Sequence, residues 1–439
     1  MNGAGKPINV LVFPCGSEIG LEIHAALRHA KDIRLHGTSS VDDHGGFAYR
    51  RYRRIDATAP SMPGPSAEAA GLVSALNALI EEWQIDLVLP AHDSAVLALA
   101  EAAATLAAPA AVPNPRTALD CRDKRLTYTR LRHLGITPDD AAAPGAGYPI
   151  FAKPAIGQGS QGAERVDTEA RHRELLDCGV PYVFSEFLPG EEYTVDCVSD
   201  RDGRLLHAAP RLRTRVRQGI SVRTAPAPAD PVLEAMASAI AAELGLKGAW
   251  FFQARRNSDG QPRLLEVAPR PAGSMAMSRM RGINYPLLHV YAHLGREFAV
   301  LPQVHPVVMD RALGNRYRID LEYRRVYLDL DDTLIVRGAV HPQLAALLYQ
   351  WAAAAIEVVL ITRHAATPLD TLHRHHLSAG LFSRIVHLQD GSPKSAAIEP
   401  GVPAIFIDDS FRERRDVHRN AGIPVFDLDA VEQLLDRTA

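Results

Sequence analysis

Cysteine is scarce in this chain, which holds only four in 439 residues. Cys15, Cys121, Cys178 and Cys197 are scattered, so they form neither the close spacing of a metal site nor a disulfide framework. Apolar runs long enough for a membrane span are missing, and so is a signal-peptide pattern at the N-terminus. These absences predict a cytoplasmic protein with no membrane segment.

Neither sign of charge dominates the chain. Its 48 Lys and Arg residues nearly balance 51 Asp and Glu residues, which leaves a net charge of −3. This balance gives no electrostatic reason to expect nucleic acid or an anionic membrane as a partner. We therefore expect small-molecule partners, and the length predicts about three domains.

The N-terminal region alternates predicted strands with predicted helices, as a doubly wound and largely parallel α/β unit does. The strands are expected at 9–13, 34–37 and 85–90, and the helices near 17–30 and at 67–83. A turn from Gly16 to Gly20 follows the first strand, and its amides can receive an anion. The full dinucleotide glycine pattern is missing, so a turn that lines a substrate crevice is favoured over a nucleotide site.

His92 and Asp93 follow the third predicted strand, at the sheet edge where such folds bind ligands. Helix capping by Asp93 or Ser94 is an equally open interpretation.

A lysine beside a glycine-rich loop marks the middle of the chain. Lys153 lies in a predicted strand at 149–154, and the segment 157–162 reads Gly-Gln-Gly-Ser-Gln-Gly. A point charge beside backbone amides that no side chain obstructs is suited to a polyphosphate. The loop does not follow the Walker pattern.

Two further strands, at 250–255 and 264–268, flank the Asp259-Gly260 dipeptide, which is typical of a two-residue hairpin turn. Pairing that is symmetrical about this turn places Gln253 opposite Glu266. Two oxygen-bearing side chains on one face suit Mg²⁺. A simple hydrogen bond between the amide and the carboxylate remains equally open.

Together, residues 116–310 resemble an ATP-grasp domain of the carboxylate-amine ligase type, as in carbamoyl phosphate synthetase and biotin carboxylase. They also resemble the ATP-grasp group associated with tellurite resistance. The resemblance implies ATP and Mg²⁺ as cofactors, a carboxylate and an amine as substrates, and a homodimer as a possible assembly. It places Lys124, Lys153 and a loop of Gly157, Gly159, Ser160 and Gly162 on the ATP phosphates, Glu186 near adenine, Glu192 on the ribose, Gln253 and Glu266 on Mg²⁺, and Arg270 on an acyl-phosphate.

The chain departs from the ATP-grasp pattern at Ala268, where the family commonly has an asparagine metal ligand. Five odd-numbered arginines surround the segment 219–221, and alternation along a strand places them on one face: Arg211, Arg213, Arg215, Arg217 and Arg223. Arg213, Arg215 and Arg223 are candidates for a fork that binds a substrate carboxylate or phosphate. A solvated basic edge strand is the open alternative.

The C-terminal region begins with an apolar strand at 326–328 that runs into Asp329-Leu330-Asp331. Alternation along a strand places Asp329 and Asp331 on one face, where one serves as nucleophile, the other as proton donor, and both hold a divalent cation. Later signals follow in order: Thr362 ends a second strand, Lys394 lies in a loop, and Asp408 and Asp409 end a third strand.

This tail resembles the haloacid dehalogenase (HAD) phosphatase superfamily. The resemblance makes Asp329 the phosphorylated nucleophile and Asp331 the general acid and base. It places Thr362 and Lys394 on the phosphoryl oxygens, and Asp408 and Asp409 in a Mg²⁺ site with Asp329 and Asp331. The short spacing between the first two motifs leaves no room for a sizeable cap domain.

The expected fold is α/β, with a Rossmann-like lobe, an ATP-grasp (α+β) domain and a small doubly wound HAD-like domain without a large cap. The expected boundaries are 1–115 for the lobe, 116–310 for the ATP-grasp domain, 311–323 for a linker and 324–439 for the HAD-like domain. The expected function is a ligase joined to a phosphatase. The alternatives are a ligase with a silent structural or regulatory HAD-like domain, and a nucleotide-dependent binding or sensing protein.

Overall fold

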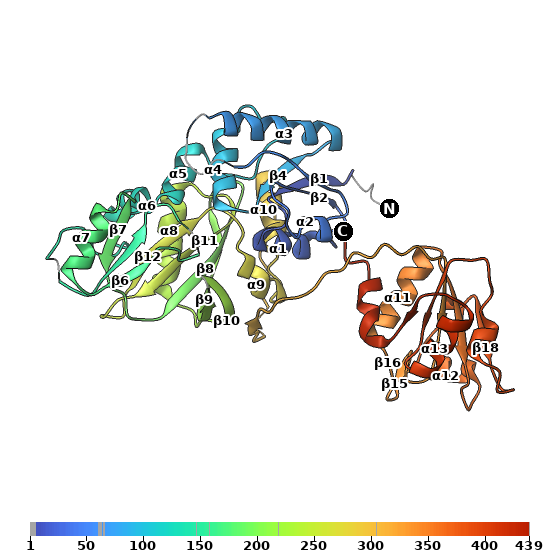
Figure 1. Ribbon diagram of the computed structural model, residues 1–439. Coiled ribbons are helices and arrows are strands. Elements are labelled where there is room, and N and C mark those ends of the chain that lie inside the picture. The colour runs from blue at the N-terminus through green and yellow to red at the C-terminus, as the bar shows by residue number, and fades with distance from the viewer. Residues whose placement is uncertain are drawn as a thin grey trace. The chain divides into compact units, whose positions relative to one another are not determined.

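The computed structural model describes residues 6–59, 64, 66–145, 147–157, 159–217, 219–303 and 305–438. The chain forms two compact units (Figure 1). The first unit takes the chain up to Leu313 together with Thr438, and the second takes Gly314–Arg437.

The first unit begins with a parallel sheet of strand order β3-β2-β1-β4. The central strand β1 is buried throughout because its side chains alternate between two apolar layers. Val10 and Val12 pack with α1 and α10 on one face, whereas Leu11 and Phe13 pack with α3 and α4 on the other. The bounds are β1 (Ile8–Phe13), α1 (Glu18–Leu27), β2 (Ile33–Ser39), α2 (Gly45–Ala48), β3 (Tyr52–Arg54), α3 (Ala67–Trp83), β4 (Leu87–Pro90), α4 (Asp93–Glu101) and α10 (Tyr285–His293).

Two short helices then lead to a small antiparallel sheet of strand order β6-β5-β7. Its core packs residues of β5 and β7 against α7. The bounds are α5 (Pro115–Arg122), α6 (Lys124–Leu131), a 3-10 helix (Arg132–Leu134), β5 (Ile150–Pro154), β6 (Glu164–Val166), α7 (Glu169–Asp177) and β7 (Tyr182–Glu186).

A larger antiparallel sheet of strand order β12-β11-β8-β9-β10-β13 completes the first unit. Trp250 and Phe252 of β11 pack with α8 on one face, and Ala249 and Phe251 pack with Tyr285 on the other. The bounds are β8 (Glu192–Ser199), β9 (Leu205–Arg217), β10 (Ile220–Pro226), α8 (Pro231–Leu244), β11 (Gly248–Arg256), β12 (Pro262–Ala268), a 3-10 helix (Gly273–Met275), α9 (Ala276–Met280) and β13 (Met309–Asp310).

The β11–β12 hairpin corrects one prediction. Arg256 pairs with Pro262, so the connection is a five-residue loop over 257–261 and the expected two-residue turn at Asp259-Gly260 is wrong. The Asn257 side chain organises this loop by accepting from the amides of Asp259 and Gln261, at 3.1 and 2.9 Å.

An irregularity in the pairing then follows between Gln253 and Ala254, opposite Leu265. It shifts the register by one residue, so Gln253 does pair with Glu266. The predicted pairing of Gln253 with Glu266 is therefore confirmed, but it results from this bulge and not from a two-residue turn.

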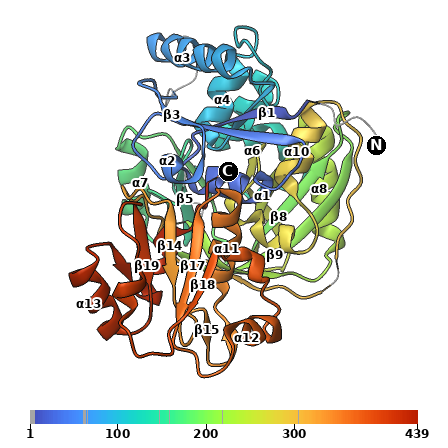
Figure 2. The same ribbon diagram turned by 90° about the vertical axis from the view of Figure 1, so that its right-hand side faces the viewer.

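The second unit is a parallel sheet of strand order β18-β17-β14-β19-β20, whose strands β14, β17 and β18 run side by side in Figure 2. Helix α11 covers one face and α13 the other. A small hairpin, β15–β16, is the only extra element between β14 and α11. The bounds are β14 (Arg325–Leu328), β15 (Ile335–Val336), β16 (Ala339–Val340), α11 (Pro342–Ala353), β17 (Glu357–Thr362), α12 (Pro368–Arg374), β18 (Arg384–His387), β19 (Ala404–Ile407), α13 (Phe411–Asn420) and β20 (Val425–Phe426), with 3-10 helices at Ala379–Leu381, Lys394–Ala397 and Leu428–Leu434.

Among the described residues, every helix is too short or too polar to cross a membrane.

Candidate functional sites

A pocket in the first unit collects most of the residues that sequence analysis assigned to a nucleotide. It opens between the small and the large antiparallel sheets and includes the apolar side chains of Phe151, Phe187 and Leu188. The predicted residues that line it are Lys124, Lys153, Gly157, Gly159, Ser160, Glu186, Glu192, Arg213, Gln253 and Glu266. Segments far apart in the sequence thus meet at one cavity.

Lys153 is buried at the pocket wall, on β5. Its ammonium group donates to the Tyr128 hydroxyl at 2.6 Å and to the Leu265 carbonyl at 2.9 Å. Burial and the nearby Lys124 lower the pKa of Lys153 to about 7, although Glu266 and Glu192 partly oppose that shift. Lys153 is therefore poised to gain its charge when an anion enters the pocket.

Lys124 opens helix α6 and reaches the glycine-rich loop. Its Nζ lies 3.5 Å from the Gly157 carbonyl, which Arg122 Nη1 approaches at the same 3.5 Å. Sequence analysis missed Arg122, although its position two residues before Lys124 was an available signal. Two cations therefore converge on the first residue of the loop.

The loop after β5 requires left-handed backbone conformations. Gly159, Ser160 and Gly162 have φ of 60°, 56° and 70°. A Cβ on Gly219 would lie 2.3 Å from the Gly159 carbonyl carbon, so glycine is required where the β9–β10 turn meets this loop. Gly162 is not among the residues that line the pocket. It lies against Pro154: a Cβ added to Gly162 would be 3.0 Å from the Pro154 Cγ.

Acidic and amide side chains face the lysines across the pocket. Gln253 and Glu266 are paired on adjacent strands, and both line the cavity. Glu192 is held by Arg213 at 2.9 Å, and Glu186 accepts from the Asp139 amide at 3.1 Å. Ala268 is buried in the apolar layer with Phe251, so it adds no oxygen ligand.

Arg270 does not line this pocket; it is buried, with its guanidinium over the Phe251 ring of β11. Its Nε and Nη2 each donate to a carboxylate oxygen of Asp93 at 2.7 Å, and Nη1 donates to the Pro271 carbonyl at 3.1 Å. Burial raises the pKa of Asp93, but Arg270 outweighs that cost and lowers it to about 2.

The N-cap of α4 is His92, whose Nδ1 accepts from the Ser94 amide at 3.2 Å. Capping by Asp93 or Ser94 is therefore wrong, because Asp93 is committed to an arginine that the sequence places 177 residues away.

The single fork expected from three arginines does not form. Arg213 is buried in the pocket wall, where its Nη2 donates to the Gly219 carbonyl at 2.7 Å. Arg215 and Arg223 are about half exposed and both bind Asp310, at 3.0 and 2.6 Å. The reason is β13, which pairs with β10 and brings Asp310 to these two side chains.

In the turn after β1, the amides of both glycines are already hydrogen-bonded within the chain and do not point to an anion site. The Gly16 amide donates to Ser39 Oγ at 3.3 Å, and the Gly20 amide to Ser17 Oγ at 3.0 Å. A Cβ on Gly16 would lie 2.0 Å from the Asp43 carboxylate. A carboxylate of the chain therefore already occupies the space beside this turn.

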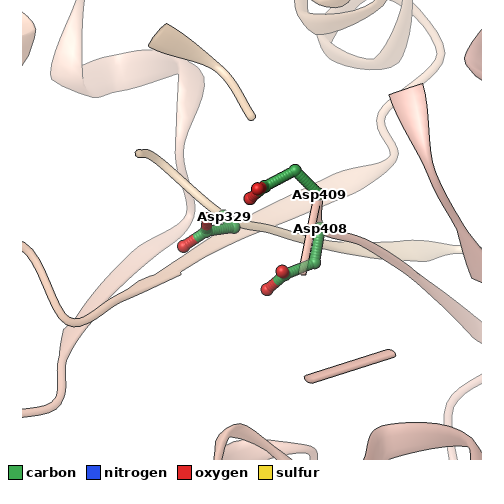
Figure 3. Close-up of side chains that lie close together, drawn as sticks. All are labelled: Asp329, Asp408 and Asp409. Carbon is green, nitrogen blue, oxygen red and sulfur yellow. The ribbon is translucent and has the colours of Figure 1, made fainter. Parts of the chain in front are cut away.

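The second unit carries a separate cluster of carboxylates at the ends of β14 and β19. Figure 3 shows Asp329, Asp408 and Asp409 together, and their ligand atoms all lie within 4.8 Å of one another. Lys394 Nζ lies 2.5 Å from Asp329 and 2.7 Å from Asp408. Burial lowers the pKa of Lys394, but the two carboxylates outweigh it and raise the pKa above its ordinary value.

Thr333 belongs to this cluster, and Thr362 ends the neighbouring strand β17. Thr333 Oγ1 lies 3.2 Å from Asp329 and 3.1 Å from Asp409, and it accepts from the Asp409 amide at 3.0 Å. Thr362 is fully buried, and its hydroxyl accepts from the His364 amide at 3.1 Å. Thr333 ends the Asp-x-Asp-x-Thr pattern that begins at Asp329, but the sequence prediction gave it no role of its own.

Asp331 does not share the face of Asp329, which corrects the alternation argument. Strand β14 ends at Leu328 and a turn begins at Leu330, so strand alternation does not extend from Asp329 to Asp331. The Asp331 carboxylate is half exposed and lies 2.8 and 3.0 Å from His364 Nδ1. Asp331 is not in the group of three carboxylates that could hold a metal ion, so the structure does not bring its side chain to them as predicted.

Comparisons with known proteins bear on the first unit. Residues 180–313 match the sequence model of a family described as ATP-grasp in the biosynthetic pathway with Ter operon. The L-amino acid ligase from Bacillus licheniformis superposes with a TM-score of 0.53 at 20% identity, over 66% of this chain and 75% of that one.

N5-carboxyaminoimidazole synthetase from Staphylococcus aureus, complexed with ADP, gives 0.55 at 14% identity, over 71% and 84%. The first unit has an ATP-grasp fold. A third ATP-grasp structure, the biotin carboxylase domain dimer of 2-oxoglutarate carboxylase from Hydrogenobacter thermophilus with MgADP, gives 0.54 at 16% identity, over 68% and 72%. No curated protein matches the chain.

Proposed function

We propose that the first unit is an ATP-dependent carboxylate-amine ligase that forms an amide bond through an acyl-phosphate and releases ADP and phosphate. One observation carries this proposal: two lysines, a glycine-rich loop and a paired amide and carboxylate all face one pocket of an ATP-grasp fold. The pocket combines the cationic and apolar surfaces that the phosphates and base of a nucleotide need.

The residues present fit ATP and Mg²⁺. Lys124, Lys153 and the loop of Gly157, Gly159 and Ser160 would hold the phosphates, with Gly162 shaping the loop. Glu186 and Glu192 would take the adenine and the ribose. Gln253 and Glu266 supply oxygen donors on adjacent strands, which suits Mg²⁺. The metal would supply charge stabilisation at the transferring phosphoryl group.

The chain's own residues then act by position and charge. Lys124 and Lys153 neutralise charge that develops as the phosphoryl group moves to the substrate carboxylate. Arg270 is held by Asp93 outside the residues that line this pocket, and it would stabilise the acyl-phosphate, until the amine attacks it, through the two N–H groups that Asp93 and Pro271 leave over. Arg213 faces the pocket and is the arginine placed to meet the substrate, whereas Arg215 and Arg223 are held by Asp310.

Phosphorus NMR of the full chain with ATP, Mg²⁺ and pools of carboxylates and amines tests this activity. The Asp329→Asn variant silences the second unit during the assay. We expect ADP and phosphate with particular pools only. Formation of AMP and pyrophosphate would mean adenylation of the acid and would contradict the proposal.

We also propose that the second unit is a HAD-type phosphatase in the same pathway, which would make the enzyme bifunctional. Three carboxylates within ligand distance of one another carry this second candidate, and a buried lysine bridges two of them, Asp329 and Asp408. Asp329 would attack phosphorus, Asp331 would protonate the leaving group and then activate water, and Thr362 and Lys394 would hold the phosphoryl oxygens. Asp329, Asp408 and Asp409 fit Mg²⁺ through their carboxylate oxygens.

Release of phosphate from p-nitrophenyl phosphate, lost in Asp329→Asn, tests the phosphatase. Its absence beside ligase turnover would leave the second unit a structural or regulatory domain. Nucleotide binding with no turnover in any pool would favour a binding or sensing protein. We further propose the four-part division at 1–115, 116–310, 311–323 and 324–439, a cytoplasmic location and assembly as a homodimer.

A further inference from the structure

Tyr128 is a buried phenol on helix α6 that the proposed ligase mechanism has not used. It lies four residues after Lys124, so both side chains project from the same side of the helix. Its ring packs with Ala155, which directly follows β5, and with Val183, which lies on β7. Helix α6 therefore delivers a second polar group to the wall that carries Lys153.

Tyr128, Lys153 and the Leu265 carbonyl form a closed triangle of hydrogen bonds. Lys153 Nζ donates to the Tyr128 hydroxyl at 2.6 Å and to the Leu265 carbonyl at 2.9 Å. The Tyr128 hydroxyl in turn donates to the same carbonyl at 3.2 Å. The carbonyl belongs to the residue opposite the irregularity in the β11–β12 pairing, which ties the triangle to the bulge.

The hydrogen-bonded triangle leaves one N–H donor of Lys153 without a partner in it. An ammonium group has three N–H donors, and two of them are bound to Tyr128 and Leu265. The third is left for the pocket that Lys153 lines. Burial raises the pKa of Tyr128, so the phenol stays neutral and keeps the proton that it donates.

We infer that Tyr128 is a positioning residue for Lys153: it holds the ammonium group charged and aimed so that one N–H meets a nucleotide phosphate. The inference rests on the proposed nucleotide site. The phenol oxygen acts through Lys153, because it accepts a hydrogen bond from the charged form and so favours that form. Its contribution therefore depends on pH.

The other groups that face Lys153 do not replace this function. Lys124, from the same helix as Tyr128, opposes the charge on Lys153. Glu266 on β12 and Glu192 on β8 favour that charge, but each has a second task, in the proposed metal pair and in binding Arg213. Among the described residues, Tyr128 and Leu265 are the direct hydrogen-bond partners of the Lys153 ammonium group.

Calorimetric titration of the full chain with MgADP at pH 6 and pH 8 tests the inference. Tyr128→Phe removes the hydroxyl and keeps the ring. We expect the Kd for MgADP to rise about tenfold at pH 8, as expected for the loss of a hydrogen bond to a charged group, and about twofold or less at pH 6. The matched control is Tyr148→Phe, whose hydroxyl bonds His172 at 3.3 Å in the small sheet, and it should leave Kd unchanged at both pH values.

Three results would overturn the inference. An unchanged Kd would show that Tyr128 does not act on the site, and an equal loss at both pH values would show a structural role alone. Failure of the wild-type chain to bind MgADP would instead remove the proposed nucleotide site, and the inference with it.

If Tyr128→Phe does not fold, site-specific difluorotyrosine at 128 keeps the ring and the hydroxyl but weakens the oxygen as an acceptor. It should give a smaller increase in Kd, again larger at pH 8. The absence of that pH dependence would count against the inference in the same way.

Discussion

The two units each bury a lysine at their candidate site, and the surroundings of the two lysines differ. Lys153 meets a phenol and a main-chain carbonyl, both neutral, and its pKa falls to about 7. Lys394 meets the carboxylates of Asp329 and Asp408, and its pKa rises. One buried charge is thus left for a ligand to neutralise, whereas the other is already neutralised by the chain.

The difference bears on what each lysine does. A buried cation without a counter-ion destabilises its surroundings and favours the arrival of an anion. A buried cation between two carboxylates holds those carboxylates in place for chemistry or for a metal.

Removing each lysine should separate the two activities. We expect Lys153→Ala to lower substrate-dependent ADP release by about 10³-fold, and Lys394→Ala to lower phosphomonoester hydrolysis by a similar factor, since each removes charge stabilisation at a phosphoryl group. Each variant should leave the other activity intact. Paired assays of ADP and of phosphate on both variants check this, and a loss of both activities in either variant would contradict it.

Stability should respond in opposite ways to neutral replacements. Lys394→Met leaves two buried carboxylates without their cation, so we expect a loss of about 3 kcal/mol in the free energy of unfolding of the second unit. Lys153→Met removes a buried charge that has no carboxylate bound to it, so it should be neutral or stabilising. Urea unfolding at pH 6.5 in the presence of EDTA measures both. Equal losses would mean that the two lysines are not in different surroundings.

Nucleotide binding should depend on pH through Lys153. The apo protein holds this lysine with a pKa of about 7, and a bound phosphate favours the charged form, so the proton is taken up on binding above neutrality. We expect the Kd for MgADP to rise about tenfold per pH unit from pH 7 to pH 9. Calorimetry in buffers of different ionisation enthalpy should show uptake of nearly one proton at pH 8.

The control for this prediction is Lys153→Met, which should bind MgADP weakly and without proton uptake. The same lysine should affect stability with a defined sign. Because its pKa is lower in the folded than in the unfolded protein, wild type should gain stability relative to this variant as pH rises from 7 toward 10. The opposite slope would show that Lys153 is charged and paired in the folded state.

His364 offers the smallest effect. Its Nδ1 faces Asp331 at 2.8 Å and its Nε2 lies 2.7 Å from the buried Thr371 hydroxyl, so it orients the proposed general acid and base. We expect His364→Ala to lower kcat for p-nitrophenyl phosphate about tenfold and to alter its pH profile, with KM and Mg²⁺ dependence unchanged. A matched control is His418→Ala on α13. A change in Mg²⁺ affinity would place His364 with the metal ligands instead.

The sequence predicted the parts of the first pocket that are local. Lys153 and its glycine-rich loop are contiguous, and the Gln253–Glu266 pair lies within one hairpin. The bulge that produces this pair was not predictable from the sequence. It depends on how β12 packs against β11 and on Tyr128 and Lys153, which bind the Leu265 carbonyl.

Local patterns also misled where a strand ended earlier than alternation assumed. Asp331 lies beyond β14, in a turn with its own geometry, and therefore faces His364 instead of the carboxylate cluster of Asp329, Asp408 and Asp409. The sequence predicted Asp93 as a helix cap, yet it is the first residue of α4 and the buried Arg270 binds its carboxylate. A charged hydrogen bond in a buried site outweighs an exposed cap, and only the packed structure shows that the arginine is there.

The sequence by itself determined the alternation of strands and loops, the order of the segments proposed to bind phosphate and the identity of the paired acids and lysines, because these follow from residue type and short-range periodicity. Tertiary structure decided which of these charges are neutralised. Tyr128 reaches Leu265 across 137 residues and Lys394 reaches Asp329 across 65, and such contacts depend on the packing of whole layers. The pKa of a buried lysine depends on those distant partners. The fold, and not the local motif, therefore decides whether its charge is left for a ligand to neutralise or is neutralised by carboxylates of the chain.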